Sequence, residues 1–175
     1  CNSEIGSCDK CYYNSGDKKV KCYLCDTNFA MFENDNKCLN KESLDNSYIN
    51  INDTHVKLCE NVINYCKECT NEKTCTKCSN GFLLSMTNDG SKYCINESIL
   101  QSGEVYLSED GSTYLYCSEP AYHDIQNCHK CSDKTSCSLC KSQFTFIDGD
   151  KSKCVEINSL SNNYIKDPKD SSNYI

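Results

Sequence analysis

The sequence has little of the apolar material from which a globular core is built. Leu, Ile, Val and Phe together supply 32 of the 175 residues, about 18%, and tryptophan is absent. With a net charge of −7, so low a fraction normally indicates disorder, because too little apolar surface is available to offset the entropy of the chain. A large hydrophobic core is therefore excluded, and a folded state needs another source of stability.

Other absences narrow the classes of function. No stretch approaches the ~20 consecutive apolar residues of a membrane-spanning helix, so we expect no transmembrane segment in this sequence. Neither a signal peptide nor an initiating Met is present, and the chain opens on Cys1, which indicates a processed product. Arginine is absent, and 25 acidic residues outnumber 18 lysines. Because a nucleic-acid partner requires a basic face, we expect none.

Cysteine is what the sequence has in excess, with 18 copies. In a chain of this kind such a content is typical of a secreted disulfide scaffold. Cross-links restrict the unfolded chain, so folding no longer depends on a large core. Complete pairing would give nine bridges of ~2–4 kcal/mol each, more than any other single contribution. We therefore expect an extracellular or cell-surface location.

The cysteines form three sets of six with the common spacing C-x(6–10)-C-x2-C-x(5–10)-C-x2-C-x(12–15)-C, and successive sets begin 58 residues apart. Such a period predicts a repeat architecture, with repeat 1 at 1–58, repeat 2 at 59–116 and repeat 3 at 117–175. Since both ends of the sequence fall on repeat boundaries, we expect a longer tandem array. The three sets are Cys1, Cys8, Cys11, Cys22, Cys25, Cys38; Cys59, Cys66, Cys69, Cys75, Cys78, Cys94; and Cys117, Cys128, Cys131, Cys137, Cys140, Cys154.

Turn-forming residues between the cysteines predict two hairpins in each repeat. In repeat 2 the first runs from 82 to 94 around Asp89-Gly90, and the second runs from 104 to 116 around Asp110-Gly111. The first hairpin has counterparts at 29–38 and 144–154. The second, which we call the terminal hairpin, has counterparts at 47–58 and 162–175.

The remaining segments are expected to be irregular. We call the segment that holds the first four cysteines of a repeat its knot, and its length and cysteine density predict no regular structure. One helical turn over 62–69 is the exception, and no long amphipathic helix is present. The predicted fold class is small, disulfide-rich and built mostly of β-hairpins and irregular loops, in an elongated tandem array of three six-cysteine repeats.

Aromatic residues recur with the cysteines, four positions after the fifth cysteine and within the terminal hairpins. Amphipathic rings suit half-buried sheet faces, so we expect these rings to pack one repeat's hairpin against the next repeat's knot. Carbohydrate or partner contacts are the alternative. The residues with this expected packing role are Phe29, Phe82, Phe144, Tyr106, Tyr114, Tyr164 and Tyr174.

The six-cysteine pattern, its two C-x2-C pairs and the aromatic that follows resemble furin-like, growth-factor-receptor cysteine-rich repeats, which are common in protist surface proteins. The resemblance covers all three repeats, although long segments such as 39–58 depart from the family. Spacing alone allows 15 connectivities per repeat. The resemblance implies that the first cysteine pairs with the third, the second with the fourth and the fifth with the sixth. These pairs are Cys1–Cys11, Cys8–Cys22, Cys25–Cys38; Cys59–Cys69, Cys66–Cys75, Cys78–Cys94; and Cys117–Cys131, Cys128–Cys137, Cys140–Cys154.

Zinc is the main alternative for the cysteines. Cys8-x2-Cys11 and Cys22-x2-Cys25 have the spacing of a four-thiolate site, but zinc would leave the first and last cysteine of every repeat without a role. A redox-active C-x2-C pair would need a helix N-terminus in a βαβ setting, which is missing. Disulfides are therefore favoured, with no metal and no cofactor.

Neither a calcium site nor a catalytic site is expected. Asp35, Asp89 and Asp148 would offer calcium ligands, but they lack the final Glu of a twelve-residue loop and are ordinary turn residues. The histidines at 55, 123 and 129 share no repeat position and have no evident nucleophile, so they are expected at the surface and no enzyme is expected.

The expected function is that of a structural repeat segment of an extracellular, glycosylated, fibre- or coat-forming surface protein. Asn52-Asp-Thr and Asn96-Glu-Ser are N-glycosylation sequons. Repeats that contact only their neighbours form open-ended arrays, so the expected partners are other copies or adjacent repeats, head-to-tail. A receptor or adhesin ectodomain with a binding face is the alternative, and an intracellular zinc protein is the third.

Overall fold

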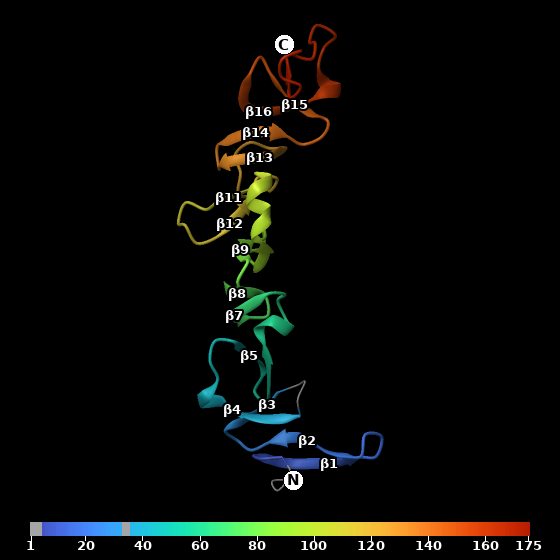
Figure 1. Ribbon diagram of the computed structural model, residues 1–175, viewed down its shortest axis with the longest axis vertical. Helices are drawn as coiled ribbons and strands as arrows, with labels where there is room; N and C mark the ends of the chain where they lie inside the picture. Colours follow the sequence, from blue (N-terminus) through green and yellow to red (C-terminus); the bar gives the residue numbers. More distant parts are fainter. Residues whose placement is uncertain (1–4, 33–35) are drawn as a thin grey trace. The chain divides into compact units, whose positions relative to one another are not determined.

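The computed structural model describes residues 5–32 and 36–175 (Figure 1). Over these ranges the fold is small, strand-rich and disulfide-rich, as predicted, with short β-hairpins, four 3₁₀ helices and irregular loops. No helix in the described ranges is long and apolar enough to cross a membrane. Contacts divide the chain into two compact units: unit 1 is Cys1–Asn80 with Lys92–Cys94, and unit 2 is Gly81–Ser91 with Ile95–Ile175.

Unit 1 contains two antiparallel hairpins and a four-stranded sheet of order β4-β3-β6-β5. The first residue of β10 adds a parallel bridge to the second hairpin, with Lys92 opposite Thr74. The strands are β1 (Cys8–Asn14), β2 (Lys19–Cys25), β3 (Phe29–Phe32), β4 (Lys37–Asn40), β5 (Tyr48–Asn52), β6 (His55–Leu58), β7 (Cys66–Asn71), β8 (Thr74–Cys78) and the first three residues of β10 (Lys92–Asn96).

Unit 2 contains the pair β11-β12 with β9 beside it, the hairpin β13-β14 and the sheet β16-β15-β17. Its strands are β9 (Phe82–Met86), β11 (Val105–Leu107), β12 (Tyr114–Tyr116), β13 (Cys128–Asp133), β14 (Ser136–Cys140), β15 (Phe144–Ile147), β16 (Asp150–Glu156) and β17 (Asn173–Tyr174). The 3₁₀ helices of the chain are η1 (Lys41–Ser43), η2 (Cys59–Asn61), η3 (Glu97–Ser102) and η4 (Ile157–Ser159).

The knots contain hairpins, so the expectation of no regular structure there is wrong. In β7, two cysteines three positions apart would face opposite sides of a regular strand, yet Cys66 and Cys69 are both buried. Register shifts between Cys66 and Glu68 and between Glu68 and Cys69 bring them to the same side, as a β-bulge does. Because of the bulge, the buried residues of this strand do not alternate with a two-residue period, so the sequence did not indicate a strand. The helical turn expected over 62–69 is also wrong, because the short helix lies earlier, in η2.

The residue before the second cysteine has a left-handed backbone in every repeat. Ser7, Tyr65 and Asn127 have φ of 62°, 63° and 61°. The carbonyl group of each accepts a hydrogen bond of 2.7–2.9 Å from the amide that follows the fifth cysteine. This recurring turn ties the start of each knot hairpin to its end.

The strand pairs β3-β4 and β15-β16 confirm two of the predicted first hairpins. Asp148 and Gly149 both have positive φ, 51° and 74°, as a tight hairpin turn of the primed type requires. In each repeat the last strand of the terminal hairpin also runs parallel to the first strand of the first hairpin. The parallel pairs are β6 with β3, β12 with β9 and β17 with β15.

Disulfides form much of the core, since cysteines are 11 of the 21 buried apolar residues in the described ranges. Eight disulfides join cysteines that are both among the described residues, and each joins two cysteines that the resemblance pairs. Cys11 is also disulfide-bonded, but its predicted partner, Cys1, lies outside the described residues. The eight are Cys8–Cys22, Cys25–Cys38, Cys59–Cys69, Cys66–Cys75, Cys78–Cys94, Cys117–Cys131, Cys128–Cys137 and Cys140–Cys154.

Candidate functional site

The candidate site is the contact between the terminal hairpin of one repeat and the knot of the next, which we call a junction. The first junction joins β5-β6 to the knot of repeat 2 and lies within unit 1. The second joins β11-β12 to the knot of repeat 3 and lies within unit 2. Both are held by backbone hydrogen bonds and by buried apolar side chains.

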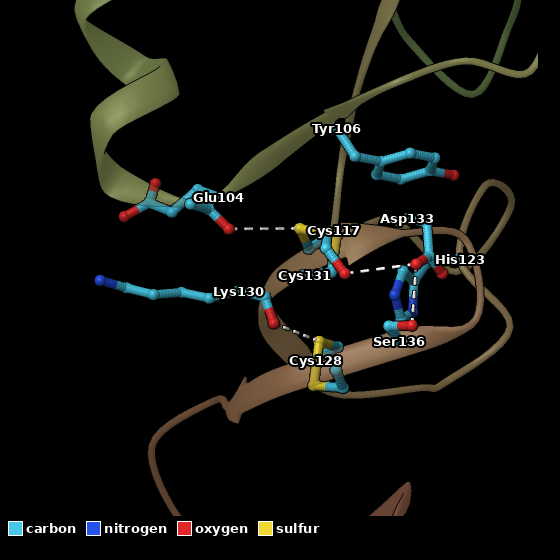
Figure 2. Close-up of a disulfide and its surroundings, with 12 residues drawn as sticks. Glu104, Tyr106, Cys117, His123, Cys128, Lys130, Cys131, Asp133 and Ser136 are labelled. Carbon is cyan, nitrogen blue, oxygen red and sulfur yellow. Dashed lines mark hydrogen bonds between the residues drawn. A yellow bond between two sulfur atoms is a disulfide. The ribbon is translucent and has the colours of Figure 1, made fainter.

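The second junction has two backbone hydrogen bonds that end on one disulfide. The amide of Cys117 donates to the carbonyl of Glu104 at 2.9 Å (Figure 2), and the amide of Cys131 donates to the carbonyl of Gly103 at 3.0 Å. Cys117 and Cys131 are bonded to each other. The entry to the terminal hairpin is therefore fixed to both halves of the cross-link.

The first junction repeats this arrangement. The amide of Cys59 donates to the carbonyl of Ser47 at 2.8 Å, and the amide of Cys69 donates to the carbonyl of Asn46 at 3.1 Å. Cys59 and Cys69 are again the disulfide-bonded first and third cysteines of their repeat. Backbone groups make all four bonds, so side-chain identity at the accepting positions is free to differ.

At each junction a buried apolar side chain lies two residues after the carbonyl that accepts from the first cysteine of the following knot. Tyr106 is 5% exposed and belongs to a hydrophobic cluster that includes Cys117, Cys131 and Phe146. Its hydroxyl donates to the carbonyl of Tyr122, and burial raises the pKa of its phenol, with nearby carboxylates adding to the rise. Ile49, its counterpart in the first junction, is also 5% exposed.

His123 lies in the second junction, so its expected surface position is wrong. Its ring is 2% exposed and meets the Tyr106 ring edge-on, with centroids 6.1 Å apart (Figure 2). The amide of Ile125 donates to Nδ1 at 3.1 Å, while Nε2 is buried with no hydrogen-bond partner in the described parts of the chain. The ring contributes mainly packing, and no sequence pattern marked it as buried.

The other two histidines are partly exposed. His55 lies beside the Asn52 sequon, with Nδ1 2.8 Å from the Thr54 hydroxyl. His129 Nε2 is 3.6 Å from a carboxylate oxygen of Glu104. This second contact crosses the junction.

The remaining residues with an expected packing role occupy varied environments. Phe144 packs against the cluster around Tyr106, and Phe29 and Phe82 are half-buried in β3 and β9. Tyr114 and Tyr174 are half-buried strand residues. Tyr164 is exposed.

Both sequons lie at the surface. Asn52 is exposed at the end of β5, and its Oδ1 accepts hydrogen bonds of 2.9 Å from the amide and hydroxyl of Thr54. Asn96 is exposed and caps η3, with Oδ1 accepting from the Ser98 amide at 2.9 Å. Asn40, which is not in a sequon, caps η1 in the same way, so capping alone accounts for an Asn at this position.

The cysteine sulfurs cluster closely enough to suggest metal sites, for example Cys66, Cys75 and Cys94. A zinc site needs thiolates, and every described cysteine is in a disulfide. The C-x2-C cysteines bond outside their own motif, as in Cys66–Cys75. The described cysteines therefore act as cross-links and present no thiolate that could bind zinc.

The acidic turn residues serve the turns themselves. Asp89 Oδ1 accepts hydrogen bonds from the Thr87 hydroxyl and the Ser91 amide, and Asp148 adopts the positive φ of its hairpin turn. Asp35 lies outside the described residues. These contacts are those of ordinary turn chemistry.

No protein-family model matches the chain, and no curated protein or solved structure is significantly similar to it.

Proposed function

We propose that this chain is a non-enzymatic structural repeat segment of an extracellular, glycosylated surface protein that builds a fibre or coat. A disulfide-rich fold is typical of extracellular proteins. The observation that carries the structural role is the recurrence of the same two-bond junction at Cys59–Cys69 and at Cys117–Cys131.

The junction explains why repeats would be stacked. A two-stranded hairpin is marginal in water by itself, and the knots of repeats 2 and 3 cover Ile49 and Tyr106 of the hairpins that precede them. Stability then accumulates from neighbour to neighbour along the chain. The expected partners remain other copies or adjacent repeats, head-to-tail, and the expected attachments are glycans.

Closely spaced disulfides are consistent with a layer that is under mechanical stress or that protects the cell. Bonded cysteines are separated by 9–16 residues, so each disulfide closes a short loop. Closing such a loop lowers the entropy of the unfolded chain and so stabilises the folded state by about 3 kcal/mol. Because local unfolding is then limited to short segments, we expect the chain to resist proteolysis and stretching.

Electron microscopy of the native material, isolated without reductant, tests this function. We expect filaments or a continuous layer, and we expect reduction with a thiol to disperse it. Single dispersed particles under non-reducing conditions would contradict the proposal.

A receptor or adhesin role is the second candidate, favoured by one observation. A hollow of about 330 Å³ beside β11-β12 is lined by apolar and charged side chains, among them Tyr106, Tyr122, Leu115, Asp110 and Lys134. Its size suits a small ligand or a peptide side chain. Dispersed particles that bind a soluble or cell-surface ligand would favour this role.

A further inference from the structure

We propose that each repeat is a site of thiol–disulfide exchange, at which a thiolate converts two neighbouring bridges into a second pairing of the same four cysteines. The two bridges join the second cysteine to the fourth and the fifth to the sixth, and we call them the paired bridges. In the second pairing, the second cysteine bonds to the fifth and the fourth bonds to the sixth. This reactivity goes beyond the proposed structural role and does not depend on it.

The paired bridges touch through two sulfurs in every repeat. The fourth and sixth cysteines place their Sγ atoms 3.6 Å apart in Cys22 and Cys38, 3.4 Å apart in Cys75 and Cys94, and 3.8 Å apart in Cys137 and Cys154. Exchange proceeds by attack of a thiolate on a disulfide sulfur, and reacting atoms about 3–3.5 Å apart are poised for reaction. If the sixth cysteine is released as a thiolate, it therefore lies beside the sulfur that it would attack.

The second and fifth cysteines lie opposite each other on the knot hairpin. In repeat 2, Cys66 is the register partner of Cys78 across β7 and β8. Opposite residues of an antiparallel pair have Cα atoms about 4.5–5.5 Å apart, within the range of about 4.4–6.8 Å that a disulfide spans. The same register joins Cys8 to Cys25 and Cys128 to Cys140. The second pairing is therefore compatible with the observed strand register.

Hydrogen bonds hold the fourth and sixth cysteines together independently of the bridges. In repeat 2 the amide of Lys92, at the start of β10, donates to the carbonyl of Lys73 at 2.9 Å. In repeat 1 Oδ1 of Asn36 accepts from the amide of Cys22 at 2.8 Å, and its Nδ2 donates to the carbonyl of Val20 at 3.2 Å. Opening the fifth–sixth bridge therefore leaves the two sulfurs near each other.

The fifth–sixth bridge is the one that solution reaches. Cys78 and Cys94 are both half-buried, whereas Cys66 and Cys75 are each 0% exposed. A small thiol therefore meets Cys78–Cys94 first. The second–fourth bridge is then attacked from inside the knot, by Cys94.

The exchange in repeat 2 takes three balanced steps. An external thiolate attacks Sγ of Cys78, forms a mixed disulfide and releases Cys94 as a thiolate. Cys94 attacks Sγ of Cys75, which forms Cys75–Cys94 and releases Cys66 as a thiolate. Cys66 attacks Sγ of Cys78, which forms Cys66–Cys78 and releases the external thiolate. The thiol is regenerated, so the exchange is an isomerisation that consumes neither oxidant nor reductant.

The bridge between the first and third cysteines lies outside this exchange. Every cluster of three close sulfurs in the described residues consists of cysteines from paired bridges: Cys8, Cys22 and Cys38; Cys66, Cys75 and Cys94; and Cys137, Cys140 and Cys154. Cys59–Cys69 instead carries the backbone hydrogen bonds of the first junction. A knot can thus change its pairing while the cross-link at its junction stays in place.

Peptide mapping of repeat 2 tests the exchange, because lysines separate its four reacting cysteines, at positions 67, 73, 77 and 92. The oxidised 175-residue chain is incubated with substoichiometric glutathione, free thiols are alkylated, and the tryptic peptides are mapped without reduction. We expect Cys66–Cys78 and Cys75–Cys94 to appear in equal amounts, with Cys59–Cys69 unchanged. Native pairing that persists while glutathione stays free would overturn the inference, as would pairings that include Cys59 or Cys69 in similar amounts.

A matched pair of variants tests the central step without added thiol. Cys78→Ser leaves Cys94 as a free thiolate, which should bond to Cys75 and leave Cys66 as the alkylated cysteine. Cys69→Ser, the control, also removes one bridge but leaves Cys59 free, and Cys66–Cys75 and Cys78–Cys94 should remain.

In Cys78→Ser we expect Cys75–Cys94 to exceed every pairing of Cys59 or Cys69 with another cysteine of the repeat by at least about tenfold, because groups held in contact react at far higher effective molarity than groups that must diffuse together. Alkylation of Cys94 with Cys66–Cys75 intact would contradict the sulfur contact as the route of exchange. Equal rearrangement in the two variants would contradict it as well, since loss of any bridge would then suffice.

Discussion

The amide of Cys131 donates a 3.0 Å hydrogen bond to the carbonyl of Gly103, just as the amide of Cys69 donates to Asn46. The chain reaches these two acceptors by different routes. A three-residue 3₁₀ helix lies upstream of Asn46, while a six-residue one ends at Gly103, whose φ is 72°. The repeats therefore share the junction itself, and the preceding loop adapts to reach it.

Replacing Gly103 with Ala should destabilise the second junction. A left-handed backbone strains a residue that carries a Cβ, and we expect a loss of about 1–2 kcal/mol in unfolding free energy. The new Cβ would lie 3.7 Å from Lys130, an ordinary contact, so the backbone conformation carries the cost. Denaturant unfolding of the oxidised protein measures it.

Gly111→Ala is the matched control, because Gly111 has φ of 70° in a turn away from the junction. Both variants should lose similar stability, but only Gly103→Ala should speed hydrogen exchange at the Cys131 amide. Equal exchange in the two variants would contradict the role given to Gly103.

Tyr65 offers a stabilising substitution. Its φ of 63° is unfavourable for an aromatic residue, whereas Asn127 occupies the same place in repeat 3 and Asn tolerates this conformation. Tyr65→Asn should raise the unfolding free energy by about 0.5–1 kcal/mol. Asn127→Tyr should lower it by a similar amount, and an unchanged denaturation midpoint in both would count against a shared left-handed turn.

Asn52 and Asn96 should carry glycans in native material. Both are exposed, and removal of N-glycans by an amidase should convert each to Asp, a shift that peptide mass spectrometry detects. Asn40, the equivalent capping residue outside a sequon, should stay unmodified. Native protein with unmodified Asn at both sequons would contradict the expected glycosylation.

Peptide mapping without reduction should recover the eight observed disulfides and Cys1–Cys11 as the ninth. Cys78–Cys94 should appear as an isolated pair. A bridge that crosses residue 58 or 116 would show that the repeats are not separately cross-linked.

Much of the fold follows from turn chemistry and cysteine spacing, as with the hairpin around Asp148-Gly149. The knot hairpins did not, because bulges between paired cysteines such as Cys66 and Cys69 break the two-residue period. The parallel strand pairs join segments far apart in sequence, which no local pattern records. The burial of His123 depends on the Tyr106 ring above it, a tertiary effect.

The junctions were foreseen only in part. Aromatic rings such as Tyr106 indicated that a hairpin packs on the following knot, but the hydrogen bonds that fix it are made by backbone groups, which leave no trace in residue identity. The burial of Ile49 was not predicted, because the packing role was assigned to aromatic residues and the position of Ile49 carries none.

The most direct test of the account is the intact mass of the non-reduced protein after treatment with a thiol alkylating reagent. All 18 cysteines are expected to pair, so the mass should lie eighteen hydrogen atoms below that of the fully reduced chain, with no alkyl group added. Several alkylated cysteines, or stoichiometric zinc in the same sample, would contradict an extracellular chain held together by disulfides.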